Sequence, residues 1–181
     1  MTGVQTCALP ISEESPVYLE LKRKYDGVVY KRRVQTTVPQ ADAFFSGGEE
    51  PGPDGQIRKE IARFRDHYQT LIPSCLIVCD RTAYFEEAGD LRLTIDRNPR
   101  YRREDLRLTG SLEGLPLLPE GWTILEVKVQ QAMPLWLSHS LSEGGIFKSS
   151  FSKYGEAYRR LLTGEDGNPT LFLLPKLSGA A

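Results

Sequence analysis

Alternating apolar and polar residues predict that this chain is built largely on β-strands. In residues 91–96 (LRLTID) the two kinds of residue alternate strictly, which places them on opposite faces of a strand. Residues 79–85 precede this run across an acidic, glycine-containing turn, and the pair is typical of a β-hairpin. We expect this hairpin to carry Arg81 and Arg92 above an apolar floor.

Two further regions repeat the pattern. Residues 18–34 form a second predicted hairpin around the turn signal Asp26-Gly27, and residues 122–130 form another alternating strand. A short strand is expected at residues 106–112. The polar faces of these strands share long charged side chains, at Glu20, Lys22, Lys31, Arg33, Arg81, Arg92, Glu126 and Lys128.

Helices are expected between the strands, where apolar residues recur at three- and four-residue intervals or where a proline opens a short apolar run. They are one or two turns at residues 39–45, residues 56–71, a short helix from Pro134 to Gly144-Gly145, and residues 147–162. The arginine-rich residues 97–105 (RNPRYRRED) are interpreted as a solvated charge run.

Composition narrows the class of protein. The chain has 181 residues, 40% hydrophobic and 26% charged, which suits one soluble domain with a core. No apolar run is long enough for a membrane span, and no secretory signal is evident. Three cysteines without framework spacing favour a reducing compartment, so we expect a cytoplasmic location. Net charge is −1, but residues 18–33 hold six bases against two acids, a local charge of +4.

Residues 1–11 stand apart from the rest. They read like the translation of a sequencing-library adapter, so we exclude them, with Cys7, from the expected fold. The predicted domain covers residues 12–165. Residues 166–181 form a tail that the pattern does not place.

The charged faces allow two architectures. An open sheet would expose them to water and give them no function, and alternation alone favours this. A sheet closed into a barrel would turn the charges inward, where crowded bases lose hydration and repel one another unless a polyanion lies between them. A glutamate among them would neutralise a base or hold a divalent cation against phosphate oxygens.

A resemblance to a known family favours the closed form. Six motifs occur in order between Tyr18 and Leu162: E-x-K at Glu20 and Lys22, K-R-R at 31–33, DRTAY at 80–84, LRLTID at 91–96, LEVKV at 125–129 and FSKY at 151–154. This series resembles the VTC domain, the polyphosphate polymerase domain of the triphosphate tunnel, CYTH-like superfamily.

The resemblance implies an α+β fold, an antiparallel β-barrel of triphosphate tunnel type with covering helices. It implies a phosphotransferase that moves the γ-phosphoryl of ATP onto polyphosphate with a divalent metal, Mn or Mg. Its partners are ATP or triphosphate and polyphosphate; no nucleic acid and no membrane segment are expected. It places phosphate contacts at Lys22, Lys31, Arg81, Arg92, Ser152 and Lys153, with Lys153 nearest the chemistry, Glu126 as metal ligand, and Arg33 and Lys128 as inward neighbours.

Two departures from the family pattern qualify these expectations. The family's opening strands, with an R-x-R motif, are missing upstream of Tyr18, so two or three barrel strands are expected to be lost. Some members also carry a lysine two residues before the last-motif serine, where this chain has Ser150. These departures leave open whether this fragment folds fully or is active, even if its parent gene encodes an enzyme.

Two other functions remain open. A tunnel of this kind could instead hydrolyse tripolyphosphate or nucleoside triphosphates. The basic hairpins could also form a non-catalytic module that binds polyanions. Nucleic-acid recognition is the weakest reading, because no aromatic platform for stacking bases is interleaved with the basic residues.

Overall fold

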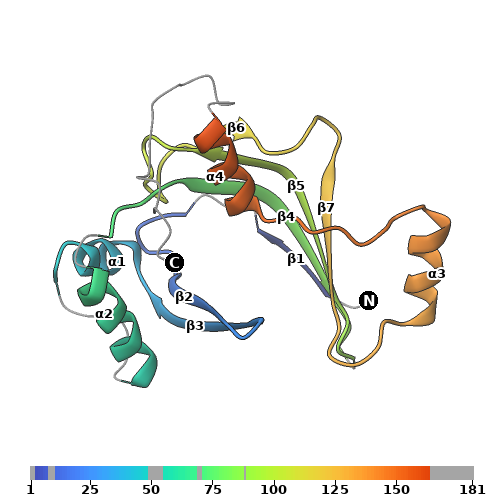
Figure 1. Ribbon diagram of the computed structural model, residues 1–181, viewed down its shortest axis with the longest axis horizontal. Helices are drawn as coiled ribbons and strands as arrows, with labels where there is room; N and C mark the ends of the chain where they lie inside the picture. Colours follow the sequence, from blue (N-terminus) through green and yellow to red (C-terminus); the bar gives the residue numbers. More distant parts are fainter. Residues whose placement is uncertain (1–2, 8–10, 49–54, 69–70, 88, 164–181) are drawn as a thin grey trace, which may run out of the picture. The chain divides into compact units, whose positions relative to one another are not determined.

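The computed structural model describes residues 3–7, 11–48, 55–68, 71–87 and 89–163. The chain divides into two compact units (Figure 1). We call Met1–Ala8, Cys75–Glu104 and Leu112–Ala181 the sheet unit, and Leu9–Ser74 with Asp105–Ser111 the hairpin unit. No helix in the described parts is both long enough and apolar enough to cross a membrane.

The hairpin unit is organised around strands β2 (Val17–Tyr25) and β3 (Val28–Thr36), which pair antiparallel. Asp26 and Gly27 between them have φ angles of 48° and 77°. Two successive positive φ angles are the requirement of the tight turns that join twisted strands, and Asp-Gly satisfies it. The hairpin predicted from the turn signal is confirmed.

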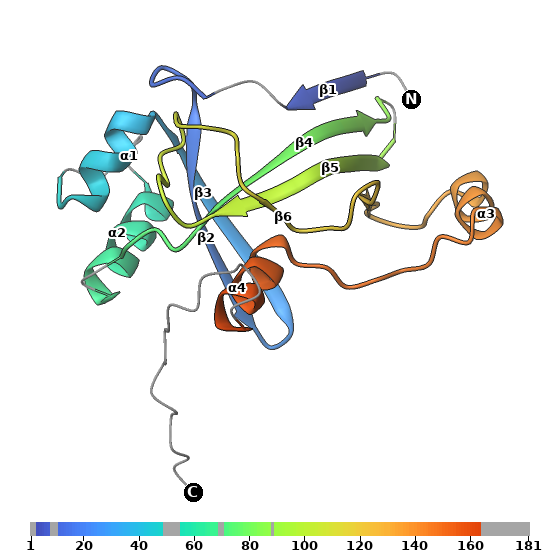
Figure 2. The same ribbon diagram turned by 90° about the horizontal axis from the view of Figure 1, so that it is seen from above.

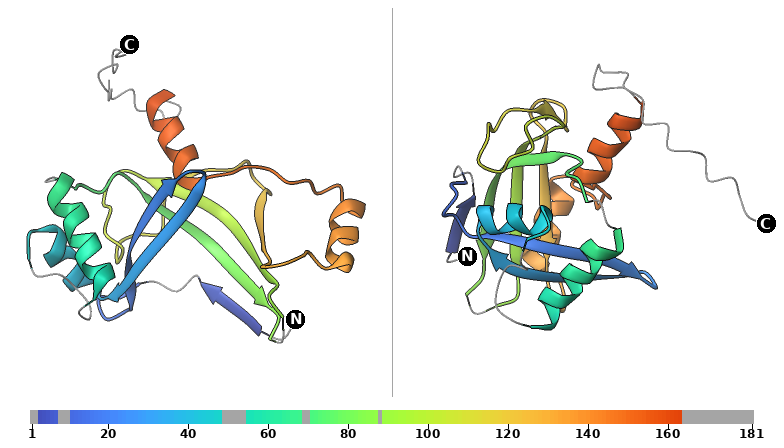
Figure 3. Two further views of the ribbon diagram at one scale, coloured as in Figure 1. Left: turned by 60° about the horizontal axis from the view of Figure 1, so that its bottom comes forward. Right: turned by 90° about the vertical axis from the view of Figure 1, so that its left-hand side faces the viewer.

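Helices α1 (Val38–Phe45) and α2 (Gln56–Tyr68) cover the apolar face of this hairpin (Figure 3). The start of α1 is closed by the Gln40 side chain, whose Oε1 accepts the Thr37 backbone N–H at 3.3 Å. The buried core of the unit comprises Leu21, Val34, Phe44, Ile61 and Ala62. Helix α2 was expected to reach residue 71; it is described to Tyr68, and residues 69–70 lie outside the described residues.

The sheet unit contains a five-stranded antiparallel sheet. Its centre is the predicted hairpin, now β4 (Leu76–Phe85) and β5 (Arg92–Arg102). Strand β1 (Gly3–Cys7) pairs with the outer side of β4 (Figure 2), although this segment was left out of the expected fold. On its other side β5 pairs with β6 (Leu115–Pro116) and with β7 (Thr123–Lys128).

Strand β5 contains a bulge. Val78 pairs with Arg100 and Asp80 with Arg97, so one residue of β4 stands opposite the two residues Asn98 and Pro99. Asn98 takes a left-handed φ of 47°, and Pro99 is tolerated because a bulge interrupts the ladder. Residues 97–102, expected to be part of a solvated charge run, continue the strand: Arg97 and Asn98 are exposed as expected, whereas Pro99 and Tyr101 are buried.

Helices α3 (Leu135–Glu143) and α4 (Lys153–Thr163) complete the sheet unit. Leu137 of α3 packs on Leu91 and Leu93, whereas Ala157 of α4 packs on Tyr101 and Leu117. The last helix was expected from residue 147 but begins at Lys153, because the Ser152 Oγ accepts the Gly155 N–H at 3.1 Å and caps it there. The strand expected at residues 106–112 is not formed.

The fold is thus mixed α+β, with antiparallel sheets and four helices among the described residues. No closed barrel is detected within them. Strands β2 and β3 pair only with each other, and the sheet that contains β4 and β5 is a separate one. A barrel needs every strand to share its ladder with two neighbours, and the pairing here does not provide that.

Candidate functional site

One face of the sheet unit collects the charged residues that alternation predicted. The strand register sets Arg81 opposite Asp96, and on the next pair Arg92 opposite Lys128 and Thr94 opposite Glu126. Residues directly opposite in an antiparallel pair share a face. The other face is apolar around Leu93 and Val127, where it packs against α3, but Asp80 and Arg97 add charge to it near the bulge. The expected division into a charged and an apolar face is confirmed for the part of the sheet that α3 covers.

Asp96 is the centre of the charged face. Arg81 donates two hydrogen bonds to it, from Nε to Oδ1 at 2.6 Å and from Nη2 to Oδ2 at 2.8 Å. Lys153 Nζ also donates to Asp96 Oδ2. The sequence-predicted residues Arg81 and Lys153, on β4 and α4, therefore meet at one carboxylate on β5. We call these three residues the Asp96 cluster.

Burial and hydrogen bonding oppose each other at this carboxylate. Burial raises the pKa of Asp96, but the hydrogen bonds from Arg81 and Lys153 outweigh it and hold the pKa below its ordinary value of 3.8. The hydrogen bond to Asp96 likewise raises the pKa of Arg81. The cluster therefore holds two positive charges and one negative charge at neutral pH.

The bulge in β5 brings helix α4 to this cluster. Asp96 and Tyr101 are five residues apart, so in a regular strand they would point to opposite faces. The extra residue at Asn98-Pro99 restores them to the same face, where Tyr101 packs on Ala157 of α4 and Asp96 contacts Lys153. The one extra residue in β5 therefore places the apolar contact of Tyr101 with α4 and the charged contact of Asp96 with Lys153 on the same face.

Arg160 anchors the same helix at its other end. Its guanidinium donates to the backbone carbonyls of Pro116 at 2.6 Å and Leu117 at 3.0 Å, and to Glu156 Oε1 at 3.0 Å. These bonds hold α4 against the loop that follows β6. The position of Lys153 at the first turn is therefore set by contacts at both ends of the helix.

The hairpin unit presents a second charged face, opposite its covering helices. Glu20 accepts from Lys31 Nζ at 2.6 Å and from Lys22 Nζ at 3.3 Å. Burial raises the pKa of Glu20, but the bonds to Lys31 and Lys22 bring it below the ordinary value. Arg33 lies over the ring of Tyr18, with 4.8 Å from Cζ to the ring centre. We call Glu20, Lys22 and Lys31 the Glu20 cluster.

Comparison with protein families decides what kind of domain carries these faces. The profile of the VTC domain matches residues 9–162. The chain belongs to the VTC domain family. Membership of this family indicates a polyphosphate-related function. No protein of curated function and no solved structure matches the chain.

The remaining residues predicted for the VTC domain are distributed as follows. Arg92 and Lys128 are exposed on the charged face of the sheet unit, where Lys128 Nζ lies 3.0 Å from Glu126 Oε1. Ser152 caps helix α4 beside Lys153, so its hydroxyl accepts a backbone N–H. Glu126 is the only predicted metal ligand, and no group of three or more His, Cys, Asp or Glu residues suited to a metal occurs in the described residues.

Asp96 was missed as a site residue, although its strand and its polar orientation were predicted. The strand register could have revealed it. Phe85 pairs with Arg92 next to the turn, and four residues further from the turn on each strand Arg81 pairs with Asp96. Cys79 lies on β4 two residues before Arg81, beside the cluster, and has no assigned role. Burial raises its pKa and the charge of Asp96 raises it further, so this thiol is kept protonated beside the cluster.

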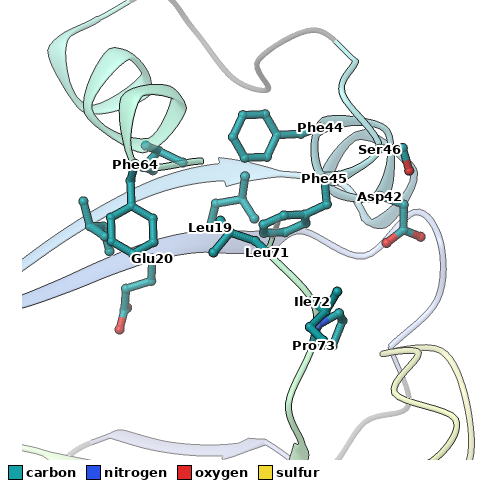
Figure 4. Close-up of a pocket in the computed structure, with 12 residues that line it drawn as sticks. Leu19, Glu20, Asp42, Phe44, Phe45, Ser46, Phe64, Leu71, Ile72 and Pro73 are labelled. Atoms are coloured by element: carbon teal, nitrogen blue, oxygen red, sulfur yellow. The ribbon is translucent and has the colours of Figure 1, made fainter. Parts of the chain in front are cut away.

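The hairpin unit of the VTC domain also has a cavity of about 610 Å³ that sequence reasoning did not anticipate. Figure 4 shows the rings of Phe45 and Phe64 on either side of Leu19 and Leu71, with the Glu20 carboxylate directed away from them. Such an apolar lining cannot replace the hydration of a phosphate chain. The cavity is therefore no candidate for polyanion binding.

Proposed function

We propose that this chain is a polyphosphate polymerase-like phosphotransferase, which moves the γ-phosphoryl group of ATP onto polyphosphate. One observation carries the proposal: in a VTC domain, Arg81 and Lys153 come from distant parts of the sequence and meet on one buried carboxylate. The family resemblance implies phosphate contact for both residues. Lys153 is the residue that we place closest to the transferred group.

The chemistry suits these residue types. Phosphoryl transfer needs little covalent assistance; it needs alignment of the reactants and positive charge near the equatorial oxygens. Asp96 engages two of the five N–H bonds of Arg81 and one of the three of Lys153, so both cations retain donors for phosphate oxygens. Arg92 and Lys128 add positive charge on the same face, where four bases stand against the two acids Asp96 and Glu126, a net +2.

The hairpin unit supplies a separate basic surface. Lys22, Lys24, Lys31 and Arg33 stand against Glu20 on its charged face, a net +3. Flexible, solvated lysines bind phosphate as point charges without fixing its orientation. We therefore assign to Lys22, Lys31 and Arg33 the retention of a polyphosphate chain, and to Arg81 and Lys153 the alignment of the reacting phosphates.

A divalent metal would be held mainly by the substrate. Magnesium usually keeps several waters and binds through one or two carboxylates together with substrate phosphates. The single carboxylate of Glu126 fits that mode, provided that Lys128 moves from it. When bound, the metal would neutralise charge on the phosphate oxygens. Manganese would bind through the same oxygen donors.

Incubation of the chain with ATP and manganese or magnesium tests the proposal. We expect polyphosphate and ADP as products, detected by ³¹P NMR and by gel electrophoresis. Lys153→Ala should abolish the polymer because it removes the cation nearest the reaction, and Glu126→Ala should reduce it strongly. Lys148→Ala is the matched control, since Lys148 is an exposed lysine five residues earlier in the chain.

Three outcomes would contradict the proposal. Polymer formed at an unchanged rate by Lys153→Ala and Glu126→Ala would remove the assigned residues from the reaction. Release of free phosphate without polymer would identify a hydrolase of tripolyphosphate or nucleoside triphosphates. Binding of polyphosphate with a steep salt dependence but no turnover would identify a binding module.

A further inference from the structure

We infer that Asp96 is a positioning residue, which sets the placement of the Arg81 guanidinium and the Lys153 ammonium relative to each other. The inference rests on the proposed function, because it assigns Asp96 a part in aligning the reacting phosphates. Asp96 ends the LRLTID motif, but the resemblance assigns it no role. The inference follows from the contacts, the burial and the arrangement of the three elements.

The contacts restrict both cations at once. Both oxygens of Asp96 are used by Arg81, through Nε and Nη2, and Oδ2 is shared with Lys153 Nζ. A side-on, two-point contact fixes the plane of a guanidinium as well as its distance. Because Lys153 is bound to one of the same oxygens, its ammonium cannot move independently of that plane.

Asp96 is buried, whereas the basic side chains of Arg81 and Lys153 are partly exposed, so Asp96 cannot have the same role as these two residues. The Asp96 side chain is 1% exposed, whereas 38% of the Arg81 and 22% of the Lys153 side chain are exposed. The carboxylate therefore lies beneath its partners, and solvent or ligand reaches the cations. A carboxylate would also repel a phosphate oxygen at contact distance. Asp96 must consequently act on a phosphate chain through Arg81 and Lys153.

A competing account makes opposite predictions. Asp96 could simply occupy a phosphate position between the two cations and compete with substrate. In that case, removing its charge should tighten anion binding and leave turnover unchanged or faster. A positioning residue behaves differently: without it the cations remain and still attract phosphate, but their alignment is lost. Turnover should then fall while affinity is kept.

Asp96→Asn separates these accounts, because it removes the charge and nearly preserves the shape. Asp80→Asn is the matched control: Asp80 lies one position earlier on β4 than Arg81, faces the opposite side and is 41% exposed. We expect kcat with ATP to fall about 10- to 100-fold in Asp96→Asn, with KM changed less than about threefold. Tripolyphosphate affinity, measured by calorimetry, should stay within about threefold of the wild type. Asp80→Asn should change none of these values.

A readout without turnover keeps the inference distinct from the proposed function. The Nε–H of Arg81 should give a ¹H–¹⁵N NMR signal protected from solvent exchange, lost in Asp96→Asn and kept in Asp80→Asn. A wild type that makes no polymer but shows this protection refutes the proposed function and leaves the positioning contact established. An Arg81 signal that is indifferent to Asp96→Asn overturns the inference.

Two further results would also overturn it. One is an Asp96→Asn protein with the kcat of the wild type. The other is tighter tripolyphosphate binding with unchanged or faster turnover, which identifies Asp96 as a competitor. Should Asp96→Asn fail to fold, judged by near-ultraviolet circular dichroism, Asp96→Glu replaces it. That variant keeps the charge but displaces it by one methylene, so the same fall in kcat is expected, and a wild-type kcat again refutes positioning.

Discussion

The Asp96 and Glu20 clusters have nearly the same composition and different physical character. In each, one carboxylate accepts hydrogen bonds from two basic side chains, and its pKa is lowered below the ordinary value. Asp96 is 1% exposed, whereas Glu20 is 24% exposed. Its partners Lys22 and Lys31 are 66% and 50% exposed, so the whole Glu20 cluster is largely solvated.

The origin of the partners explains this difference. Glu20, Lys22 and Lys31 belong to one hairpin, and any β-hairpin with this alternation would bring them together. Asp96, Arg81 and Lys153 come from two strands and a helix, and their meeting depends on the packing of Tyr101 against α4. The Glu20 cluster, formed within one hairpin, stays exposed to solvent, whereas the Asp96 cluster, assembled by tertiary packing, buries its carboxylate.

The difference in burial between the two clusters should have its largest effect on the stability of the folded chain. Asp96→Ala should lower the free energy of unfolding by about 3 kcal/mol, because it leaves two partly buried cations without their partner. Glu20→Ala should lower it by less than about 1 kcal/mol, since exposed ion pairs contribute little. Urea denaturation followed by circular dichroism measures both values. Equal losses in the two variants would mean that burial does not distinguish the clusters.

Acid should remove the stabilisation that the ionised Asp96 carboxylate provides. The folded-state pKa of Asp96 lies below 3.8, so its stabilisation is complete above that pH and is lost as the pH falls through the folded-state pKa. The stability difference between the wild type and Asp96→Asn should therefore be constant from pH 7 to 5 and shrink below pH 4. Glu20→Gln should show the same sign with a smaller amplitude. A difference that grows on acidification would assign the opposite pKa shift to Asp96.

Local signals in the sequence were sufficient for much of the fold. The turn at Asp26-Gly27, the alternation of β2, β3, β5 and β7, and the break at Gly144 all depend on neighbours in the chain. These elements were predicted correctly, with their charged faces. Lys22, Lys31 and Arg33 were expected on the polar faces of their strands for the same reason, and the hairpin register places them on one face.

Features that depend on tertiary packing were not predictable in the same way. Asp96 meets Arg81 only in one register of β4 and β5, and alternation does not reveal the bulge that carries β5 onward to Tyr101. The arginine-rich residues 97–105 have the composition of a solvated segment, and the sequence does not show that Tyr101 among them is buried against helix α4. The start of α4 was placed too early because its apolar pattern extends upstream, whereas a single serine cap decides the boundary.

The bulge itself can be tested by a smaller change. Asn98→Ala should destabilise the chain by about 1 kcal/mol, because alanine tolerates the left-handed φ of 47° poorly and loses the 2.9 Å bond to Asp80 Oδ2. Asn98→Gly, which loses only the bond to Asp80, should cost less. If alanine costs no more than glycine, the backbone conformation at Asn98 contributes nothing to the bulge.

The smallest expected effect, that of salt on the coupling energies, separates the clusters most cleanly. A double-mutant cycle of Glu20→Ala and Lys31→Ala should give a coupling below about 0.5 kcal/mol that vanishes in 1 M salt, where charges are screened within about 3 Å. The cycle of Asp96→Ala and Arg81→Ala should keep most of its coupling, because neither ions nor water reach the Asp96 oxygens. Loss of both couplings in 1 M salt would show that Asp96 is solvated. Asp96 would then fix the positions of Arg81 and Lys153 no better than Glu20 fixes those of Lys22 and Lys31.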